Sequence, residues 1–333
     1  MRPEDLLAWS EELGAPFGTA DVYRAGGSNR DLVRMVDAKA WHRLGRGSFV
    51  SAALWAIANE RARHRMAVAA RLRGKDARWA AARRSAAVFH DLPLLGRVPT
   101  VPQLLRDPDG NRSKGKDRHE RIATFTEAER EEIDGIAVSN LARTVNDLAR
   151  QEAFRNGLIA ADGALRRGMG QDELLAMAKA HKDWPGGWNA IMVARLANGL
   201  HETALESLSW AACHTLGLEM PEPQVQVFLG SRLIARVDGL WRTRNTIGQA
   251  DGLYKYNDRL GVIKDKKQDE ELEDLGFEVA RWGWDEAYRP EGVLDDRLRR
   301  AFERGSRQQL DPRVRLVATT LEQSLKWTGL IAS

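Results

Sequence analysis

Apolar positions in the first 52 residues follow a helical spacing and then change to an alternating one. A helix near the amino-terminus is predicted from the positions Leu6, Leu7, Trp9 and Leu13. After the pair Gly26-Gly27, a second apolar side is formed by Leu32, Val33, Met35 and Val36. We predict that this helix covers Asn29 to about Ala38. Residues 41–50 alternate and are broken by glycines, which is typical of a β-hairpin.

The helix predicted after Gly27 begins with a capping signal and has a basic polar side. Ser28 is followed three residues later by Asp31, as in a capping box. Helix, glycine turn, capped helix and basic hairpin is the element order of a winged helix-turn-helix. In that geometry, major-groove contacts are expected from Ser28, Asn29, Arg30 and Arg34, and phosphate or minor-groove contacts from Arg43 and Arg46. The alternative is a small helical domain whose arginines are only solvated.

The middle of the chain is predicted to be mostly helical. Residues 53–95 contain two helices rich in alanine and arginine, 96–138 resemble short strands and loops, and 139–198 return to helices. The segment Asp183–Trp188 contains proline and two glycines and marks a domain junction. The arginines of 53–95 either contact DNA phosphates or form a solvated surface, and the sequence leaves both alternatives open. They are Arg61, Arg63, Arg65, Arg71, Arg73, Arg78, Arg83 and Arg84.

From about residue 199 the pattern changes again. A long helix is predicted over 202–217, followed by three β runs at 224–228, 233–241 and 245–255. A charged helix at 264–275 then leads into a β run at 277–282. The order α-β-β-β-α-β is that of a restriction-endonuclease-like core. We expect the tail to be helical and to lie outside this core.

Together these patterns predict an α+β protein with four parts. They are a winged helix-turn-helix at 1–52, a mostly helical middle domain at 53–198, a nuclease-like domain at 199–305 and a helical tail at 306–333.

Composition and charge narrow the functional classes. No run approaches the roughly 18 consecutive apolar residues of a membrane span, so no membrane partner is expected. The single cysteine, Cys213, cannot form an internal disulfide, which fits a reducing cytoplasm. Residues 1–120 hold 22 Lys and Arg against 14 Asp and Glu, whereas 121–333 hold 29 against 33. A basic first third suggests an anionic partner such as double-stranded DNA.

The C-terminal domain carries acidic residues suited to phosphodiester hydrolysis. Such chemistry needs two or three carboxylates around Mg²⁺ or Mn²⁺, and a lysine that places water or stabilises charge. Glu206 lies on the long helix and Asp238 late in the second β run. Gln249 and Asp251 lie two apart in the third run and so share one face. The metal ligands expected are Glu206, Asp238 and Asp251, and the basic candidates are Lys255 and Lys266. The alternative is that Asp238 and Asp251 are strand-end or turn residues.

At these residues the sequence resembles a known family. The segments HETALESLSW, PEPQVQV, RVDGLW, IGQADGLYKY and DLGFEVARWGWDE are similar to a domain of actinobacterial proteins related to very-short-patch-repair endonucleases, in the PD-(D/E)XK superfamily. Upstream, WHRLGRGSFV, RRSAAVFHDLPLLG and DGIAVSNLARTVNDLAR resemble AbiEi-like antitoxin proteins. The resemblance covers about 45–290 and is more specific in its C-terminal motifs.

The chain departs from that family at one position of the acidic set. The family's third motif is typically G-E-F-D-G-x-x-K-Y, and Gln249 stands where it has glutamate. An amide can touch a metal but brings no negative charge and cannot act as a base. Three explanations remain open: a natural loss of catalysis, an engineered inactive variant, or compensation by Asp251 or Glu202.

Two main functions follow from these observations. The first is a DNA-binding regulator of the AbiEi antitoxin type, which represses its operon or counters a toxin protein in phage defence. Its nuclease-like domain would then be a degenerate binding module. The second is a Mg²⁺-dependent DNA endonuclease directed by its N-terminal domain. A third hypothesis is a scaffold for protein interactions.

Overall fold

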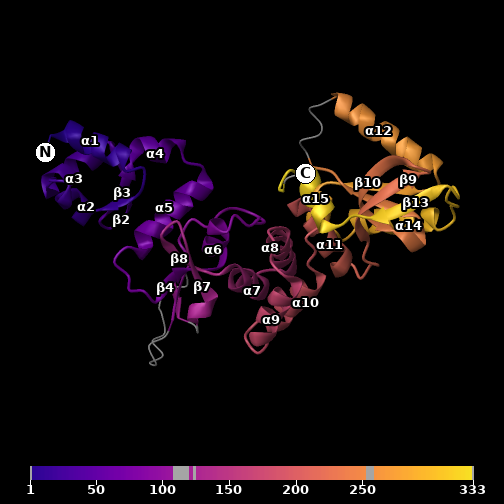
Figure 1. The fold of residues 1–333 in the computed structure, drawn as a ribbon, viewed down its shortest axis with the longest axis horizontal. Coiled ribbons are helices and arrows are strands. Elements are labelled where there is room, and N and C mark those ends of the chain that lie inside the picture. Colours follow the sequence, from indigo (N-terminus) through magenta and orange to yellow (C-terminus); the bar gives the residue numbers. More distant parts are fainter. Residues whose placement is uncertain (1, 108–119, 123–124, 253–258, 332–333) are drawn as a thin grey trace. The chain divides into compact units, whose positions relative to one another are not determined.

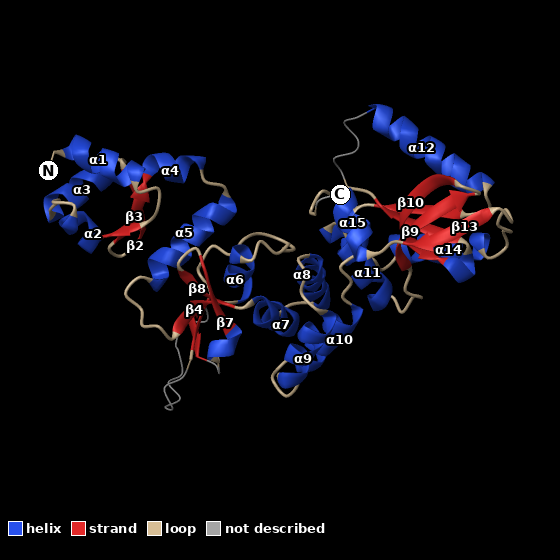
Figure 2. Ribbon diagram, viewed as in Figure 1, coloured by secondary structure: helices blue, strands red, loops and turns tan. Residues whose placement is uncertain are grey.

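The computed structural model describes residues 2–107, 120–122, 125–252 and 259–331 and shows an α+β protein (Figures 1 and 2). The chain divides into two compact units, Met1–Leu148 and Ala149–Ser333. The boundary lies inside helix α7 (Leu141–Gln151). The predicted middle domain is therefore divided: its first part folds with the amino-terminal elements, and its last helices pack with the C-terminal elements. Among the described residues, no helix is both long and apolar enough to cross a membrane.

The amino-terminal elements agree closely with the hydrophobic pattern. They are α1 (Pro3–Glu12), β1 (Phe17–Gly18), α2 (Thr19–Arg24), α3 (Asn29–Asp37), β2 (Trp41–Gly45) and β3 (Ser48–Ser51). The strands form a small sheet in the order β1-β3-β2. Its core gathers Leu6, Phe17, Val22, Leu32, Met35, Trp41 and Phe49. The buried indole N–H of Trp41 donates to Ser10 Oγ at 2.9 Å, which joins the hairpin to α1.

The glycine pair between α2 and α3 is required by the backbone. Gly26 has φ +87°, in the left-handed region that favours glycine. A Cβ on Gly27 would lie 2.7 Å from Val22 Cγ1. The tight turn therefore brings α3 against α2.

The rest of the first unit contains a sheet that the sequence pattern underestimates. Its elements are α4 (Ala52–Ile57), α5 (Glu60–Leu72), β4 (Trp79–Ala81), α6 (Arg83–Phe89), β5 (Leu104–Arg106), β6 (Glu120–Ile122), η1 (Glu127–Glu129), β7 (Arg130–Ile133) and β8 (Ile136–Ser139). The strand order is β6-β5-β4-β8-β7. Four of these strands fall in or at the end of the stretch 96–138, for which short strands and loops are predicted. Only β4 lies in the segment 53–95, predicted to be helical, and its three residues are too few for a clear alternation.

The second unit begins with helices and continues into a mixed sheet. The helices are α8 (Phe154–Arg166), α9 (Gln171–Ala180), α10 (Gly187–Leu196) and α11 (Ala204–Thr215). The strands and helices that follow are β9 (Glu222–Leu229), β10 (Arg232–Trp241), η2 (Arg242–Arg244), β11 (Thr246–Ala250), α12 (Arg259–Asp274), β12 (Glu278–Trp282), α13 (Trp284–Tyr288) and α14 (Val293–Gly305). From α11 to β12 this is the predicted order α-β-β-β-α-β. Among the described strands of this sheet, β11 and β12 are the one parallel pair, and α12 lies between them in the chain.

The predicted helical tail is wrong in its first half. Val314–Ala318 forms strand β13, which pairs antiparallel with β9 and closes the sheet order β12-β11-β10-β9-β13. Helix α15 (Leu321–Trp327) follows. The run VRLVA is rich in valine and suits a pleated edge position, but only the free edge of β9 makes it a strand. The sheet domain therefore extends past residue 305.

Candidate functional sites

Helix α3 is held at its start by the predicted capping box. Ser28 Oγ accepts from the N–H of Asp31 at 3.3 Å, and the N–H of Ser28 donates to Asp31 Oδ2 at 2.9 Å. The hydrogen bond with the Ser28 side chain holds the pKa of the Asp31 carboxyl below its usual value. Ser28 therefore serves the helix first, and its hydroxyl is already engaged with the Asp31 carboxylate at 2.6 Å.

The outer side of α3 exposes two arginines around an apolar side chain. Leu32 and Met35 are buried, whereas Val33, expected on the apolar side, is 61% exposed. Arg30, Val33 and Arg34 are spaced i, i+3 and i+4, so they lie on one side of the helix. We call these three residues the α3 face. Within the described part of the chain, the guanidinium groups of Arg30 and Arg34 make no hydrogen bond or ion pair.

The other predicted DNA contacts lie beside this helix or on the hairpin. Asn29 is exposed and accepts a hydrogen bond from the Tyr23 hydroxyl. Arg43 lies over the Phe49 ring, with 5.7 Å from Cζ to the centroid. Arg46 is exposed in the turn between β2 and β3. The predicted basic residues of the helix and hairpin are thus all accessible.

The arginine-rich stretch after residue 53 is used largely inside its own unit. Arg65 donates to the carbonyl of Val88 at 2.9 Å and to Asp91 at 2.8 Å. Arg73 donates to Asp21 at 2.7 Å and to the Pro16 carbonyl at 2.9 Å. Arg61, Arg63 and Arg84 likewise donate to backbone carbonyls. These five guanidinium groups hold loops in place, so the stretch offers fewer phosphate contacts than its composition suggests.

In the second unit, one glutamine joins two of the predicted acidic residues. Glu206 is buried in the first turn of α11 and accepts from the Glu202 N–H and the Thr203 hydroxyl, both at 2.9 Å. Gln224 Nε2 lies 2.9 Å from Glu206 Oε2 and 3.5 Å from Asp238 Oδ1. The other oxygen of Asp238 accepts from the N–H of Ala250 at 2.8 Å. Glu206 and Asp238 are therefore neighbours, as predicted from their order along the chain.

Gln224 is the residue of this cluster that sequence reasoning missed. It lies in β9 with φ +51°, a conformation that costs a non-glycine residue about 1 kcal/mol or more. Its side chain is buried. The alternation of glutamine and valine in PEPQVQV was the available signal, since a buried amide needs a partner.

Asp251 and Gln249 flank Ala250, whose N–H donates to Asp238, and both are next to Arg281 of β12. Both oxygens of Asp251 accept from Arg281, at 3.0 and 2.9 Å, and Arg281 also pairs with Asp269 at 2.6 and 2.7 Å. Burial lowers the pKa of Arg281, but the hydrogen bonds with Asp269 and Asp251 outweigh it and raise the pKa. Gln249 is 8% exposed, and it lies opposite Arg281 in the register of the parallel strands β11 and β12.

The remaining predicted residues have other partners or lie outside the described residues. Lys266 is exposed on α12 and its Nζ lies 4.0 Å from Glu270. Lys255 lies outside the described residues. Glu202, considered as a compensating carboxylate, pairs with Arg236 and accepts from the Ser324 hydroxyl at 2.7 Å. Glu202 therefore connects α15 to the start of α11 and does not replace the missing charge.

The predicted acidic residues offer few free oxygen ligands for a divalent metal. Mg²⁺ binds converging oxygen ligands, usually carboxylates and water. Asp251 has both oxygens on Arg281, and Gln249 is neutral. Across residues 2–107, 120–122, 125–252 and 259–331, no three His, Cys, Asp or Glu side chains form a group that could hold a metal ion. Among the described residues, Glu206, Asp238 and Asp251 do not form such a group, and binding of Mg²⁺ or Mn²⁺ stays a prediction.

Comparison with known proteins gives no relative from which a role could be transferred. No protein-family model matches the chain, and no curated protein matches it. The site geometry therefore carries the functional argument.

Proposed function

We propose that this protein binds double-stranded DNA through α3, in the manner of a winged helix-turn-helix protein. The main support for DNA binding is the exposed α3 face. Arg30 and Arg34 extend from a capped helix, and no described residue pairs with them. Arginine reads guanine in the major groove, and an exposed apolar side chain such as Val33 suits a thymine methyl group.

The hairpin and the charge distribution support the same function. Arg43 and Arg46 follow α3 on β2 and in the next turn, where a wing would reach the backbone. Residues 1–148 hold 25 Lys and Arg against 20 Asp and Glu, whereas 149–333 hold 26 against 27. The excess positive charge belongs to the unit that contains α3, as expected for binding to phosphates.

The biological role proposed with this activity is that of a repressor or antitoxin of the AbiEi type. In this role, the C-terminal sheet domain, for which the sequence predicts a PD-(D/E)XK-like core, acts as a binding module. This second part rests on Gln249 and on the pairing of Asp251 with Arg281, which leave too few acidic ligands among the described residues. A toxin protein and operator DNA are the partners that this role implies.

The test is duplex binding by the full chain, measured by fluorescence anisotropy on sequences selected from a random pool. Arg30→Ala with Arg34→Ala should weaken specific binding by about 1–3 kcal/mol for each lost base contact. The matched control is Arg167→Ala with Arg195→Ala, which removes the same charge from exposed positions of the second unit. Specific binding that survives the first pair of substitutions would exclude α3 as the reading helix.

A second candidate function is DNA cleavage, and one observation favours it. Glu206 and Asp238 are brought together by Gln224, whose strained backbone is typical of functional sites. The assay compares the chain with Gln249→Glu and Asp238→Ala on supercoiled DNA with Mg²⁺ or Mn²⁺. Cutting that increases with glutamate and disappears with Asp238→Ala supports an endonuclease. If none of these proteins cuts, the binding role stands alone.

A further inference from the structure

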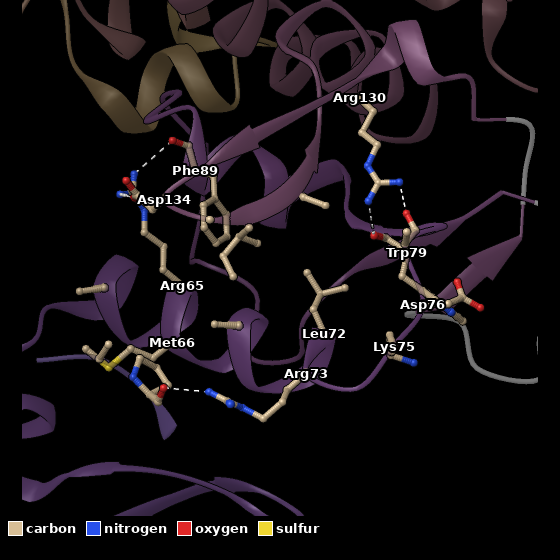
Figure 3. A pocket seen from close by; sticks show the side chains of 18 of the residues that line it. Arg65, Met66, Leu72, Arg73, Lys75, Asp76, Trp79, Phe89, Arg130 and Asp134 are labelled. Carbon is tan, nitrogen blue, oxygen red and sulfur yellow. Dashed lines mark hydrogen bonds and ion pairs between the residues drawn. The ribbon is translucent and has the colours of Figure 1, made fainter. Parts of the chain in front are cut away.

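The first unit contains a cavity of about 700 Å³ that the DNA-binding proposal does not use. It lies between α5, the strands β4 and β8, and the segment Gly14–Pro16 that joins α1 to β1 (Figure 3). We call it the α5 cavity. All its lining residues belong to the unit Met1–Leu148. Its volume falls within the range of about 300–1,000 Å³ found for small-molecule sites.

The central wall of the α5 cavity is apolar. Leu72 and Phe89 extend toward its middle in Figure 3. The wall is completed by small or flexible apolar residues, Ala62, Met66, Ala69, Ile136 and Ala137. A wall of this kind favours a flat apolar body, because it offers contact area and few polar partners.

One end of the α5 cavity is cationic. Arg130 donates to the carbonyls of Ala77 and Trp79, and to no carboxylate of the described residues. A guanidinium bound only by carbonyls keeps its full charge and has five N–H donors, so further donors are available for an anion. Lys75 Nζ lies 3.9 Å from the centre of the Trp79 ring and adds a second positive charge.

Asp76, a carboxylate of the lining beside Lys75, already has a cationic partner. Asp76 is paired with Arg78, which is not part of the lining, at 2.6 Å. The hydrogen bond with Arg78 lowers the pKa of Asp76 to about 2, so its charge is already matched. At the opposite end Asp134, which is largely exposed, lies 3.5 Å from Arg65. Among the described residues, the charge of Arg130 therefore stays without a carboxylate partner at the end of the cavity beside Trp79.

We infer that the α5 cavity binds a small aromatic anion. The planar body lies against Leu72 and Phe89, and a carboxylate, sulfonate or phosphate group receives hydrogen bonds from Arg130. Aromatic rings add offset or edge contacts to the area they bury. Charge-assisted hydrogen bonds from a planar guanidinium then fix the orientation. This site goes beyond the proposed DNA binding and does not depend on it.

The test uses 8-anilinonaphthalene-1-sulfonate, an aromatic sulfonate whose fluorescence rises in apolar surroundings, with the full chain. N-phenyl-1-naphthylamine, which lacks the sulfonate, is the uncharged comparison. Arg130→Gln should weaken binding of the sulfonate about tenfold or more, because the substitution removes the guanidinium group that binds it. The uncharged compound has no group that needs this partner, so its binding should stay nearly unchanged. Ala69→Phe fills the cavity and should abolish binding of both compounds. Arg97→Gln, an exposed arginine of the same unit outside the lining, is the matched control.

Circular dichroism of each variant first establishes that it is folded. A single sulfonate site that responds to both substitutions in this way supports the inference. Equal affinity for the two compounds, unchanged by Arg130→Gln, would overturn the anion selectivity. Undiminished binding in folded Ala69→Phe would show that the dye binds elsewhere and would overturn the site. The dye-binding test does not depend on the DNA-binding experiment, so either proposal can fail while the other stands.

Discussion

Arg143 shows how far the role of a single charged residue depends on its surroundings. Its side chain is 1% exposed in α7 and pairs with Glu129 at 3.0 Å and Asp147 at 2.9 Å. It also lies over the Phe125 ring. In the sequence it is one arginine among many. In the fold it is the central cation of a buried network that joins α7 to η1.

Replacement of Arg143 should therefore be strongly destabilising. Arg143→Met leaves two buried carboxylates without their cation, which costs about 3–5 kcal/mol of unfolding free energy. Arg143→Lys keeps the charge but not the planar donor geometry, so its loss should be smaller. Urea unfolding followed by circular dichroism measures both. A loss below about 1 kcal/mol in the methionine variant would mean that the network is compensated in another way.

His64 makes stability of the first unit depend on pH. Its Nε2 lies 2.8 Å from Ser85 Oγ, and burial lowers the pKa of its imidazole to about 4 from an ordinary value of 6.5. Between those values the unfolded chain binds a proton and the folded chain does not. Stability should therefore fall as the pH drops from 6.5 to 4, by up to about 3 kcal/mol.

The comparison for this prediction is His64→Gln, which cannot take up the proton. Thermal unfolding at pH 7 and pH 5 should show a smaller difference in midpoint for the variant than for the natural chain. Equal differences in the two proteins would assign the pH dependence to other groups.

At the scale of elements, close packing of strand β11 limits which residues it can contain. A Cβ on Gly248 would lie 2.5 Å from the Trp282 ring and 2.9 Å from the Trp241 ring. Trp282 is itself held by a hydrogen bond of 2.7 Å from its indole N–H to Ser209 Oγ on α11. The two indoles therefore occupy the space above the glycine, and they fix how β11 lies against β10 and β12.

Gly248→Ala should destabilise the second unit by about 1–3 kcal/mol, because the added methyl group forces these rings apart. Gly45→Ala is the control, since a Cβ there meets nothing within 4 Å and its φ is not positive. It should change the unfolding free energy by no more than about 0.5 kcal/mol. Chemical unfolding of both variants, with tryptophan fluorescence as the signal, tests the difference. Similar values would show that the rings adjust freely.

At the scale of the whole molecule, the proposed DNA-binding charge lies in one of two compact units. Residues 1–148 contain α3, the hairpin and the α5 cavity, whereas Glu206, Gln224 and Asp238 lie in residues 149–333. Each unit has its own buried core. The two candidate activities can thus be separated by experiment.

A fragment of residues 1–152, which ends just after α7, should bind duplex DNA with the salt dependence of the full chain. The slope of log K against log salt reports the number of phosphates neutralised, and the basic residues responsible are in this fragment. Fluorescence anisotropy over a range of salt concentrations measures both slopes. A markedly steeper slope for the full chain would place phosphate contacts in the second unit as well.

Much of the local structure follows from the sequence alone. The apolar spacing and the Ser28–Asp31 capping box predict α3 almost to its bounds, and alternation predicts the hairpin β2–β3. The order α-β-β-β-α-β of the C-terminal domain follows from the same patterns. These features depend on residues within a few positions of one another, so the spacing of apolar residues in the sequence is enough to predict them. Glu206 and Asp238, two of the three residues predicted as metal ligands, share the partner Gln224.

Only the tertiary structure decided which chemical groups remain available. The arginines after residue 53 donate to distant carbonyls, Asp251 pairs with Arg281, and β13 completes the sheet at β9. Gln224 lies between Glu206 and Asp238 with a positive φ, a backbone conformation that the local sequence pattern does not predict. The α5 cavity likewise arises where α5, β4 and β8 meet. Each of these contacts joins residues that are far apart in the chain. Tertiary packing brings such residues together, and the local spacing of apolar residues does not predict it.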